Sequence, residues 1–321
     1  MEARDAISAS RDAGAGTDPS RSLQAPSARY GEKVVEGLLA LCAVLSVLTT
    51  TAIVVSLLEP SIEFFGEVSI GDFLFGTDWA PTFTPPEFGV LPIVLATMVT
   101  SFWGLVVAIP LGIGAAIYLS EYASPRVRKV VKPTLEVLAG VPTVAIGFFA
   151  LFFMRPVIED LLPFLPWSGP QAAGVAGLAV GLMIVPLIAS LSEDAMSAVP
   201  RGLREAGYGL GATKMRVATR VVFPAALSGI VASIVLATSR AVGETMIVLL
   251  AAGASPNLTV GFTESVQTMT AFIGQTATGD IATGTITYYT IFAVGLLLFL
   301  ITLLLNLISI RLVRRFHEAY E

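Results

Sequence analysis

The 321-residue sequence predicts an all-α polytopic membrane protein with six transmembrane helices and both termini in the cytoplasm. The first observation behind this prediction is composition, because 55% of the residues are hydrophobic and only 13% are charged. Soluble domains carry about 45–50% apolar and about 25% charged residues. The other two observations are the lengths of the uncharged stretches and the uneven distribution of lysine and arginine between them. Together they exclude a single soluble domain.

The rare residue types exclude several kinds of site. A single cysteine, Cys42, and a single histidine, His317, cannot form a disulfide framework, a zinc cluster or a Cys/His nucleophile pair. No predicted span contains the aspartates that an intramembrane protease would need. The net charge of −5 argues against a nucleic-acid partner. We therefore expect no catalytic residues and no metal ligands, and we expect a lipid bilayer around the chain.

The N-terminal part of the chain divides into three segments. Residues 1–32 are rich in Ala, Ser, Gly, Asp and Arg, which predicts a disordered cytoplasmic tail. The uncharged run Gly37–Leu58 predicts a first transmembrane helix at residues 33–58, because about 20 residues of helix cross a hydrocarbon core. A signal peptide is the alternative, but its apolar core has only about 7–15 residues. Residues 59–87 hold six acidic and no basic residues and are expected to form an extracytoplasmic loop.

Residues 88–312 are expected to form the transmembrane core, with five further spans. These stretches lack the period-2 alternation of a membrane β-barrel. The predicted segments are Phe88–Ser120, Val137–Met154, Gly169–Ser192, Ala225–Gly253 and Ile286–Ile310. The first is too long for one span, so we expect a helix at about Leu91–Ser120 with a bend near Pro110. Five glycines are expected at close helix–helix approaches rather than at ligand sites, namely Gly112, Gly114, Gly174, Gly177 and Gly181.

The basic residues predict the orientation of the chain in the membrane. Seventeen of the nineteen lysines and arginines fall in the N-terminal tail, in the connections after the second and fourth spans, and at the C-terminus. Arg155 is the only basic residue in the other set of connections, and Arg240 lies within the fifth span. Because basic residues concentrate in cytoplasmic connections, the tail and residues 313–321 are expected in the cytoplasm, with the N-terminus inside.

The connection between the fourth and fifth spans, residues 193–224, carries the most patterned polar segment. Its apolar residues and interspersed glycines predict two short amphipathic helices joined by a glycine turn. The basic residues of this loop are expected to face solvent or lipid headgroups. Four apolar residues are expected to share one side of the helices, namely Ala206, Leu210, Val217 and Val221. The loop is either an interfacial helix pair or a docking element for a cytoplasmic partner.

The same loop resembles a known motif. Glu205, Ala206 and Gly207, followed by Gly211 and Pro224 at matching spacings, resemble the EAA loop of prokaryotic ABC-importer permeases. The departures from the family pattern are Gly207, Val221 and Phe223. The resemblance implies an ABC transporter type-1 permease fold and a coupling role for these residues against a separate ATPase. No phosphate-binding GxxxxGK[ST] loop occurs in the sequence, so we expect no cofactor in this chain, with ATP and Mg bound by the partner ATPase.

Two charged residues lie inside the fifth predicted span. Arg240 and Glu244 are spaced i, i+4, which predicts that they share one helix face within reach of each other. An ionisable side chain at membrane depth costs at least about 2.5–3.5 kcal/mol and usually faces a cavity or a partner. From chemistry alone, the pair is either an internal ion pair that locks the helix or an anion site in which the arginine fork meets phosphate-like oxygens.

The residues around this pair resemble a narrower family. The segment from Arg240 to Met246 is similar to the R-A-x-G-E-T-M stretch of the PstC family, one of the two permease families of the bacterial high-affinity phosphate importer. Further similarity to that family lies in Phe73–Trp79, Phe88–Pro92 and Gly140–Ala150, and the resemblance covers about residues 35–312. It implies that Arg240 and Glu244 belong to the translocation path for inorganic phosphate.

The resemblance also implies partners and a location. The expected complex contains a second permease, PstA, two copies of the ATPase PstB and the extracytoplasmic phosphate-binding protein PstS, in a bacterial inner membrane. Transport would proceed by alternating access. Three alternatives stay open: a permease for another oxyanion or a phosphonate, the paralogous PstA-type subunit, and a self-contained anion channel or carrier. Association with an ATPase distinguishes the channel or carrier from the others.

Overall fold

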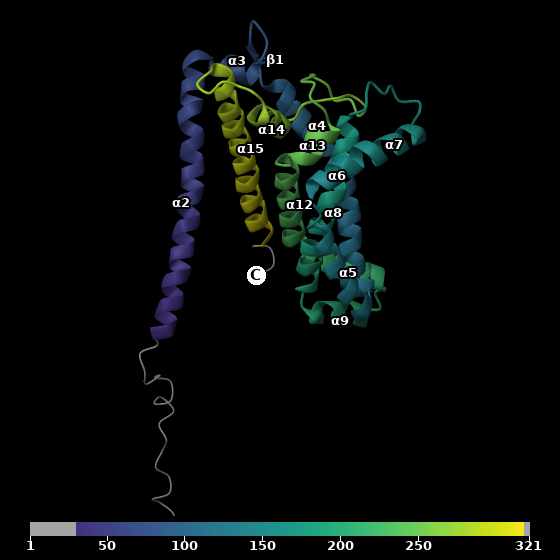
Figure 1. Ribbon diagram of the computed structural model, residues 1–321. Coiled ribbons are helices and arrows are strands. Elements are labelled where there is room, and N and C mark those ends of the chain that lie inside the picture. The colour runs from purple at the N-terminus through teal and green to yellow at the C-terminus, as the bar shows by residue number, and fades with distance from the viewer. Residues whose placement is uncertain (1–29, 318–321) are drawn as a thin grey trace, which may run out of the picture. The chain divides into compact units, whose positions relative to one another are not determined.

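The computed structural model describes residues 30–317 and divides into two units, Met1–Val54 and Val55–Glu321, each considered by itself. Residues 1–29 of the predicted tail, and residues 318–321 of the predicted C-terminal segment, lie outside the described residues. The described chain is predominantly helical, which confirms the all-α prediction (Figure 1). Within it, four helices are long and apolar enough to cross a membrane, or six if each of two bent helix pairs is one span. The higher number agrees with the six predicted spans.

The first long helix, α2 (Tyr30–Glu67), contains the predicted span at residues 33–58 and continues beyond it. The expectation that residue 59 begins a loop is therefore wrong. Three glutamates in the extension, Glu59, Glu63 and Glu67, are spaced four apart and are good helix formers. The first of these glutamates ends the hydrophobic run, but the helix continues to Glu67. Pro60 lies inside it, and the Ser61 hydroxyl donates a hydrogen bond to the carbonyl of Leu57 at 2.6 Å.

The remainder of the predicted 59–87 loop is compact. Helix α3 (Ile70–Phe75) is capped by Ser69 and leads into an antiparallel pair of short strands, β1 (Trp79–Ala80) and β2 (Glu87–Phe88). The backbones of Gly76 and Gly89 are in contact, and a Cβ on Gly76 would lie only 2.6 Å from the Cα of Gly89. Trp79 is buried and packs edge-to-face on Phe272, with ring centroids 4.8 Å apart. The segment is therefore fixed by aromatic packing and by a glycine contact that no larger residue permits.

The centre of the second unit is a pair of helices that run side by side, α4 (Leu91–Ile117) and α8 (Ala173–Ser197) (Figure 1). Their backbones approach closely at glycines: a Cβ on Gly177 would lie 2.6 Å from the Thr100 carbonyl oxygen, and one on Gly181 would lie 2.7 Å from that of Gly104. Small residues of this kind let membrane helices pack closely. The prediction of close helix–helix approach is confirmed for Gly112, Gly177 and Gly181. It is wrong for Gly174, where a Cβ would meet the ring of Phe262 outside any helix, and for Gly114, where a Cβ would meet nothing within 4 Å.

The predicted start of α4 at Leu91 is confirmed. The helix continues through Pro110 and passes into a π-helical turn, η2 (Tyr118–Tyr122), before it ends. The predicted fourth span begins at Gly169, whereas α8 begins at Ala173 and ends at Ser197. The predicted coupling loop therefore starts five residues too early, since residues 193–197 are helical.

The predicted third span, Val137–Met154, is interrupted. Helix α5 (Pro125–Leu138) is followed by a turn, after which α6 (Thr143–Phe149), the π-helix η3 (Ala150–Met154) and α7 (Arg155–Leu161) form a second arm bent by 87° from the first. Gly140 and Pro142 explain the break, because glycine is a poor helix former and proline restricts the residue before it to extended backbone.

The predicted fifth span, Ala225–Gly253, is also divided. Three short helical segments come first and form one arm, namely α10 (Lys214–Val217), η4 (Ala218–Val222) and α11 (Phe223–Ala225). Helix α12 (Leu227–Val242) follows and is bent by 71° from this arm. A separate helix, α13 (Met246–Ala251), follows a break centred on Glu244.

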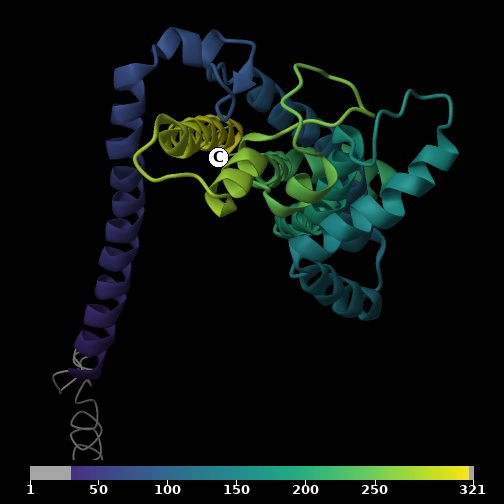
Figure 2. The same ribbon diagram turned by 45° about the horizontal axis from the view of Figure 1, so that its top comes forward.

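The last part of the chain holds one helix that the sequence analysis did not expect. Helix α14 (Met269–Thr278) lies between the fifth and sixth predicted spans, and it begins where the Thr268 hydroxyl accepts a hydrogen bond from the N–H of Ala271 at 3.2 Å. The final helix, α15 (Ile286–His317), begins at the predicted residue. Figure 2 shows α14 and α15 adjacent to each other in the second unit.

Replacing Gly181 with alanine is expected to destabilise the α4–α8 pair, because the new Cβ would lie 2.7 Å from the Gly104 carbonyl oxygen. Overpacking of this kind costs about 1–3 kcal/mol and should lower the Tm of the detergent-purified protein. Gly114→Ala in α4 is the matched control, since a Cβ there meets nothing within 4 Å. Equal losses of Tm in the two variants would contradict the close packing at Gly181.

Candidate functional site

The EAA-like loop forms two short helices joined by a tight turn. Helix α9 (Arg201–Gly209) is followed by Gly211, whose φ of +77° is in the left-handed region that favours glycine. The Thr213 side chain then caps α10 by accepting a hydrogen bond from the N–H of Arg216 at 3.4 Å. The prediction of two short helices with a glycine turn is confirmed. The second glycine of the motif is therefore required by backbone conformation.

Gly207 lies where the two arms of the loop meet. A Cβ at this position would be 3.1 Å from Cγ2 of Val217 and 3.8 Å from Cγ2 of Val221. The motif's second alanine, which Gly207 replaces, would be a tight fit here. This departure from the family pattern therefore has a packing reason in this chain.

The outer surface of the loop is apolar as well as charged. None of the residues of α9 is buried, and Glu205 and Ala206 are exposed. Four large apolar side chains on the two helices and their turn are also exposed, namely Leu203, Tyr208, Leu210 and Met215. The predicted common apolar side is wrong, because Val217 is fully buried whereas Leu210 is 90% exposed. We refer to the four exposed residues as the apolar set, and groups of this kind mark interaction sites.

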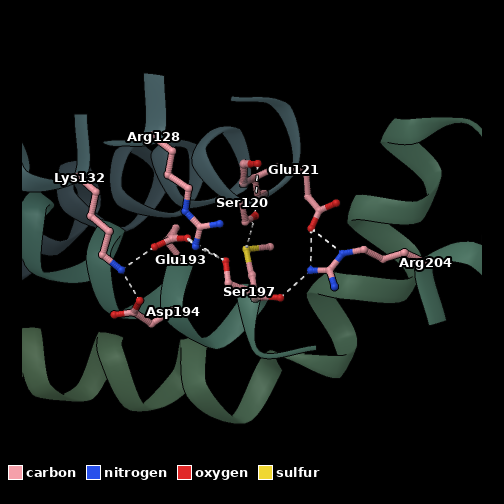
Figure 3. A network of polar contacts seen from close by, with 10 residues as sticks. Ser120, Glu121, Arg128, Lys132, Glu193, Asp194, Ser197 and Arg204 are labelled. Carbon is pink, nitrogen blue, oxygen red and sulfur yellow. Dashed lines mark hydrogen bonds and ion pairs between the residues drawn. The ribbon is translucent and has the colours of Figure 1, made fainter. Parts of the chain in front are cut away.

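One basic residue of the loop does not face solvent or headgroups as predicted. The Arg204 guanidinium reaches the ends of two membrane helices (Figure 3). It pairs with Glu121 at 3.0 Å and donates hydrogen bonds to the carbonyls of Met196 and Val199 at 2.7 and 2.6 Å. The side chains of Arg204 and Glu121 are only 16% and 4% exposed. Residues 121 and 204 lie too far apart in the chain for local spacing to indicate this pair.

A second ionic group lies beside this pair and joins α5 to α8 (Figure 3). The Glu193 carboxylate is fully buried and pairs with Arg128 and with the Lys132 ammonium, the latter at 2.8 Å. Ser197 donates a hydrogen bond to the same carboxylate at 2.7 Å, and Lys132 also pairs with Asp194. Two cations and a hydroxyl therefore compensate one buried charge, as burial requires. Glu193 was predicted to begin the coupling loop, and this is wrong, because it lies within α8.

Arg240 and Glu244 do not share a helix face. Helix α12 ends at Val242 with Gly243 as its C-cap, so the i, i+4 relation is broken between the two residues. Arg240 is exposed in the last turn of α12, where the helix dipole favours a cation. In the described part of the chain, it forms no ion pair with Glu244. The predicted pairing is therefore wrong, and the role of both residues in a translocation path stays a prediction.

Glu244 instead organises the break between α12 and α13. It is 8% exposed, and its Oε1 accepts hydrogen bonds from the N–H groups of Met246 and Ile247 at 3.0 and 3.2 Å. Its own carbonyl accepts a hydrogen bond from the Thr270 hydroxyl at 2.6 Å, which connects the break to α14. The carboxylate therefore satisfies backbone donors that have no helical partner.

The exception in the charge pattern, Arg155, is buried. Its guanidinium lies 4.0 Å from the centre of the Trp167 ring, pairs with Glu159 at 2.8 Å and donates a hydrogen bond to the Gly169 carbonyl at 2.6 Å. These contacts hold the segment after α7 in place, and they pair the charge of Arg155 with groups inside the protein.

An acidic cavity lies in the segment between α2 and α4. It has a volume of about 520 Å³, and its lining includes Glu67, Asp72, Asp78 and Glu87. Among the described residues, no group of three histidine, cysteine or acidic side chains is arranged to hold a metal ion. The cavity therefore presents negative charge without a metal-binding geometry.

Sequence comparison relates the chain to membrane transport permeases. Residues 108–319 match the family described as binding-protein-dependent transport system inner membrane component. The chain is 32% identical to the probable ABC transporter permease protein YqgH of Bacillus subtilis, with 84% of this chain and 88% of that protein covered. It is 36% identical to the phosphate transport system permease protein PstC of Haemophilus influenzae (67% and 73% covered) and 32% identical to PstC of Pasteurella multocida (73% and 78% covered).

Solved structures show the same fold. A chain of a bacterial alginate ABC transporter, in complex with an alginate-bound periplasmic protein, matches with a TM-score of 0.60 and 15% identity, covering 90% of this chain and 98% of that one. A chain of the inward-facing MetNI methionine ABC transporter matches with a TM-score of 0.51 and 22% identity, covering 71% and 94%. These likenesses confirm the predicted ABC transporter type-1 permease fold.

Replacing Glu244 with alanine is expected to lower the Tm of the purified protein, because α13 loses the acceptor for two N–H groups. Loss of a helix cap typically costs about 1 kcal/mol. Glu244→Gln keeps an oxygen at the same place and should retain most of the stability. If the glutamine variant were destabilised as much as the alanine variant, the charge of Glu244 would matter more than its capping bonds.

Proposed function

The chain belongs to the family of binding-protein-dependent transport system inner membrane components, and we propose that it is a permease subunit of an ATP-driven importer of inorganic phosphate. The main support for phosphate as the substrate is the 32–36% identity of this chain to phosphate transport system permeases named PstC, over two thirds or more of its length. The R-A-x-G-E-T-M segment that begins at Arg240 adds support. As a multi-pass inner membrane permease, the chain would form half of the transmembrane path.

The ATPase would dock on the loop formed by α9 and α10. The geometry of this loop supports the proposal: α9 buries none of its residues, and the apolar set is exposed on the surface that carries Glu205 and Ala206. Gly211 and Pro224 bound the second arm of the motif. The chain has no phosphate-binding loop of its own. ATP and Mg would therefore be bound by the partner, and this subunit would be non-catalytic.

The proposed complex contains one copy of this chain with PstA, two copies of the ATPase PstB and the extracytoplasmic binding protein PstS. The distribution of basic residues supports an orientation with the N-terminus and the α9–α10 loop inside. ATP-driven closure of the ATPase pair would then act on the inner ends of the helices and alternate the access of the path.

Arg240 is the proposed anion contact in this path. It is exposed at the end of α12 and has no ion-pair partner in the described part of the chain, so its guanidinium is available to phosphate oxygens. Glu244 would act differently from the original prediction. Its hydrogen bonds to the start of α13 support a bracing role beside the path, which keeps the position of Arg240 relative to α13 constant.

Arg240→Gln is expected to reduce phosphate uptake by about tenfold or more, because a hydrogen bond to a charged group contributes about 1.5–3 kcal/mol. Uptake is measured in proteoliposomes that contain the complete complex with its binding protein, and assembly is checked by co-purification. Arg311→Gln, at an exposed arginine of α15, is the matched control. Sulfate and phosphonate competition tests the alternative substrates. Normal phosphate uptake by an assembled Arg240→Gln complex would contradict the proposed contact.

Leu210→Glu is expected to abolish co-purification of the ATPase, because Leu210 is 90% exposed on the proposed docking surface and its replacement introduces a charge there. Phe164→Glu is the matched control, since Phe164 is 78% exposed on the segment after α7, away from the loop. A self-contained channel or carrier would bind no ATPase in either form. Retention of the ATPase by the Leu210→Glu variant would require a different docking surface.

A further inference from the structure

Helix α9 is held to the membrane helices by one polar side chain. None of its residues is buried, and Gly207 faces Val217 in the second arm of the loop. In the part of the chain that the structure describes, Arg204 is the only side chain of α9 with a hydrogen bond or ion pair to α8 or to the end of α4. Force applied to α9 therefore has one well-defined polar route into the bundle.

The contacts of Arg204 reach two elements at once (Figure 3). Its Nε and Nη2 donate to the same oxygen of Glu121, at 3.2 and 3.0 Å, and Glu121 belongs to the π-helical turn η2 that continues α4. Its Nη2 also donates to the carbonyl of Met196 in the last turn of α8, and its Nη1 donates to the carbonyl of Val199 in the short connection between α8 and α9. One rigid guanidinium thus joins α9 to both members of the central helix pair.

The chemistry of this junction makes it difficult to replace. The Met196 carbonyl lies in the last turn of α8, where Arg204 adds a hydrogen bond to that of the Val199 N–H and interacts favourably with the helix dipole. The Glu121 side chain is 4% exposed, so removal of Arg204 would leave a buried carboxylate without its cation. Lysine carries one point charge and lacks the planar fork that bonds a carboxylate and two carbonyls together.

The elements at the other side of the junction are themselves tightly connected. Helices α4 and α8 touch backbone to backbone at Gly104 and Gly181, so they have little freedom to slide separately. Glu193 joins α8 to α5 through Arg128 and Lys132. A displacement delivered at the Arg204 junction would consequently reach α4, α5 and α8 as one body.

We propose that Arg204 and Glu121 form the junction that transmits movement of the ATPase-docking helix α9 to the α4–α8 pair. Arg204 is a positioning residue in this proposal, since its side chain is only 16% exposed and acts through Glu121 rather than on ATP or the transported anion. The proposal rests on the docking role proposed above for the α9–α10 loop. Without the junction, the ATPase still docks on the apolar set, but less of the movement of α9 reaches the α4–α8 pair.

The first experiment compares coupling in Arg204→Gln, Glu121→Gln and the control Arg126→Gln, an exposed arginine at the start of α5. Each complete complex is reconstituted, and phosphate uptake is measured per ATP hydrolysed. The expected result is co-purification of the ATPase in the wild-type ratio, with uptake per ATP lowered by about tenfold or more in both junction variants. Glu121→Gln keeps the shape of the side chain, so it decides the outcome if Arg204→Gln does not assemble. Wild-type coupling in Glu121→Gln would overturn the proposal.

The second experiment does not depend on the transported substrate. Spin labels are attached to Gly202→Cys in α9 and Tyr118→Cys in η2, in a chain with Cys42→Ser; both labelled positions are exposed, and a Cβ at Gly202 meets nothing within 4 Å. We expect one narrow distance that is the same with and without ATP, and a broad or ATP-dependent distance in Arg204→Gln. A wild-type distance that changes with ATP, or an unchanged distribution in Arg204→Gln, would overturn the junction. The expected distances without phosphate uptake would instead refute the proposed substrate alone.

Discussion

A backbone N–H or carbonyl that loses its helical partner inside a bilayer has no water to replace it. This constraint governs the interrupted helices of the second unit, where polar side chains take over bonds at the breaks. Glu244 accepts from the first N–H groups of α13, Thr268 accepts from α14, and Arg204 donates to the Met196 carbonyl in the last turn of α8. These three polar side chains therefore lie at helix ends, where the chain changes direction.

Close backbone packing and polar junctions have complementary effects on the core. The glycine contacts between α4 and α8 hold two helices at a fixed separation over several turns. The groups around Glu193 and Arg204 then attach α5 and α9 to the same end of that pair. Helix α12 is joined to α15 by a hydrogen bond between Ser239 and Asn306 at 3.0 Å. The proposed path residue Arg240 thus follows directly after a residue that bridges two membrane helices.

Local sequence signals predicted the elements that depend on local physics. Hydropathy located the starts of α4 and α15, and glycine spacing located the α9–α10 turn. The errors arose where a charge was interpreted as the end of a helix or as a solvent-exposed group. Glu193 is helical and buried because its cations come from α5, some sixty residues earlier in the chain. The partners Glu121 and Arg204 are 83 residues apart in the chain. Glu244 caps α13 because the helix breaks after Val242, whereas its i, i+4 spacing from Arg240 suggested one continuous helix.

The acidic cavity between α2 and α4 has an electrostatic consequence for the surface that carries it. Residues 59–87 contain six carboxylates and no cation, and four of these carboxylates line one cavity. An anion that diffuses toward this surface meets a repulsive potential, so its local concentration falls below that of the bulk by a Boltzmann factor. The exponent of this factor is proportional to the charge of the anion, so it is twice as large for a divalent anion as for a monovalent one. Salt confines this depletion to a layer about 8 Å thick under physiological conditions. Free anion is thus kept scarce at this surface, whereas an anion enclosed within a carrier protein is shielded from the repulsion.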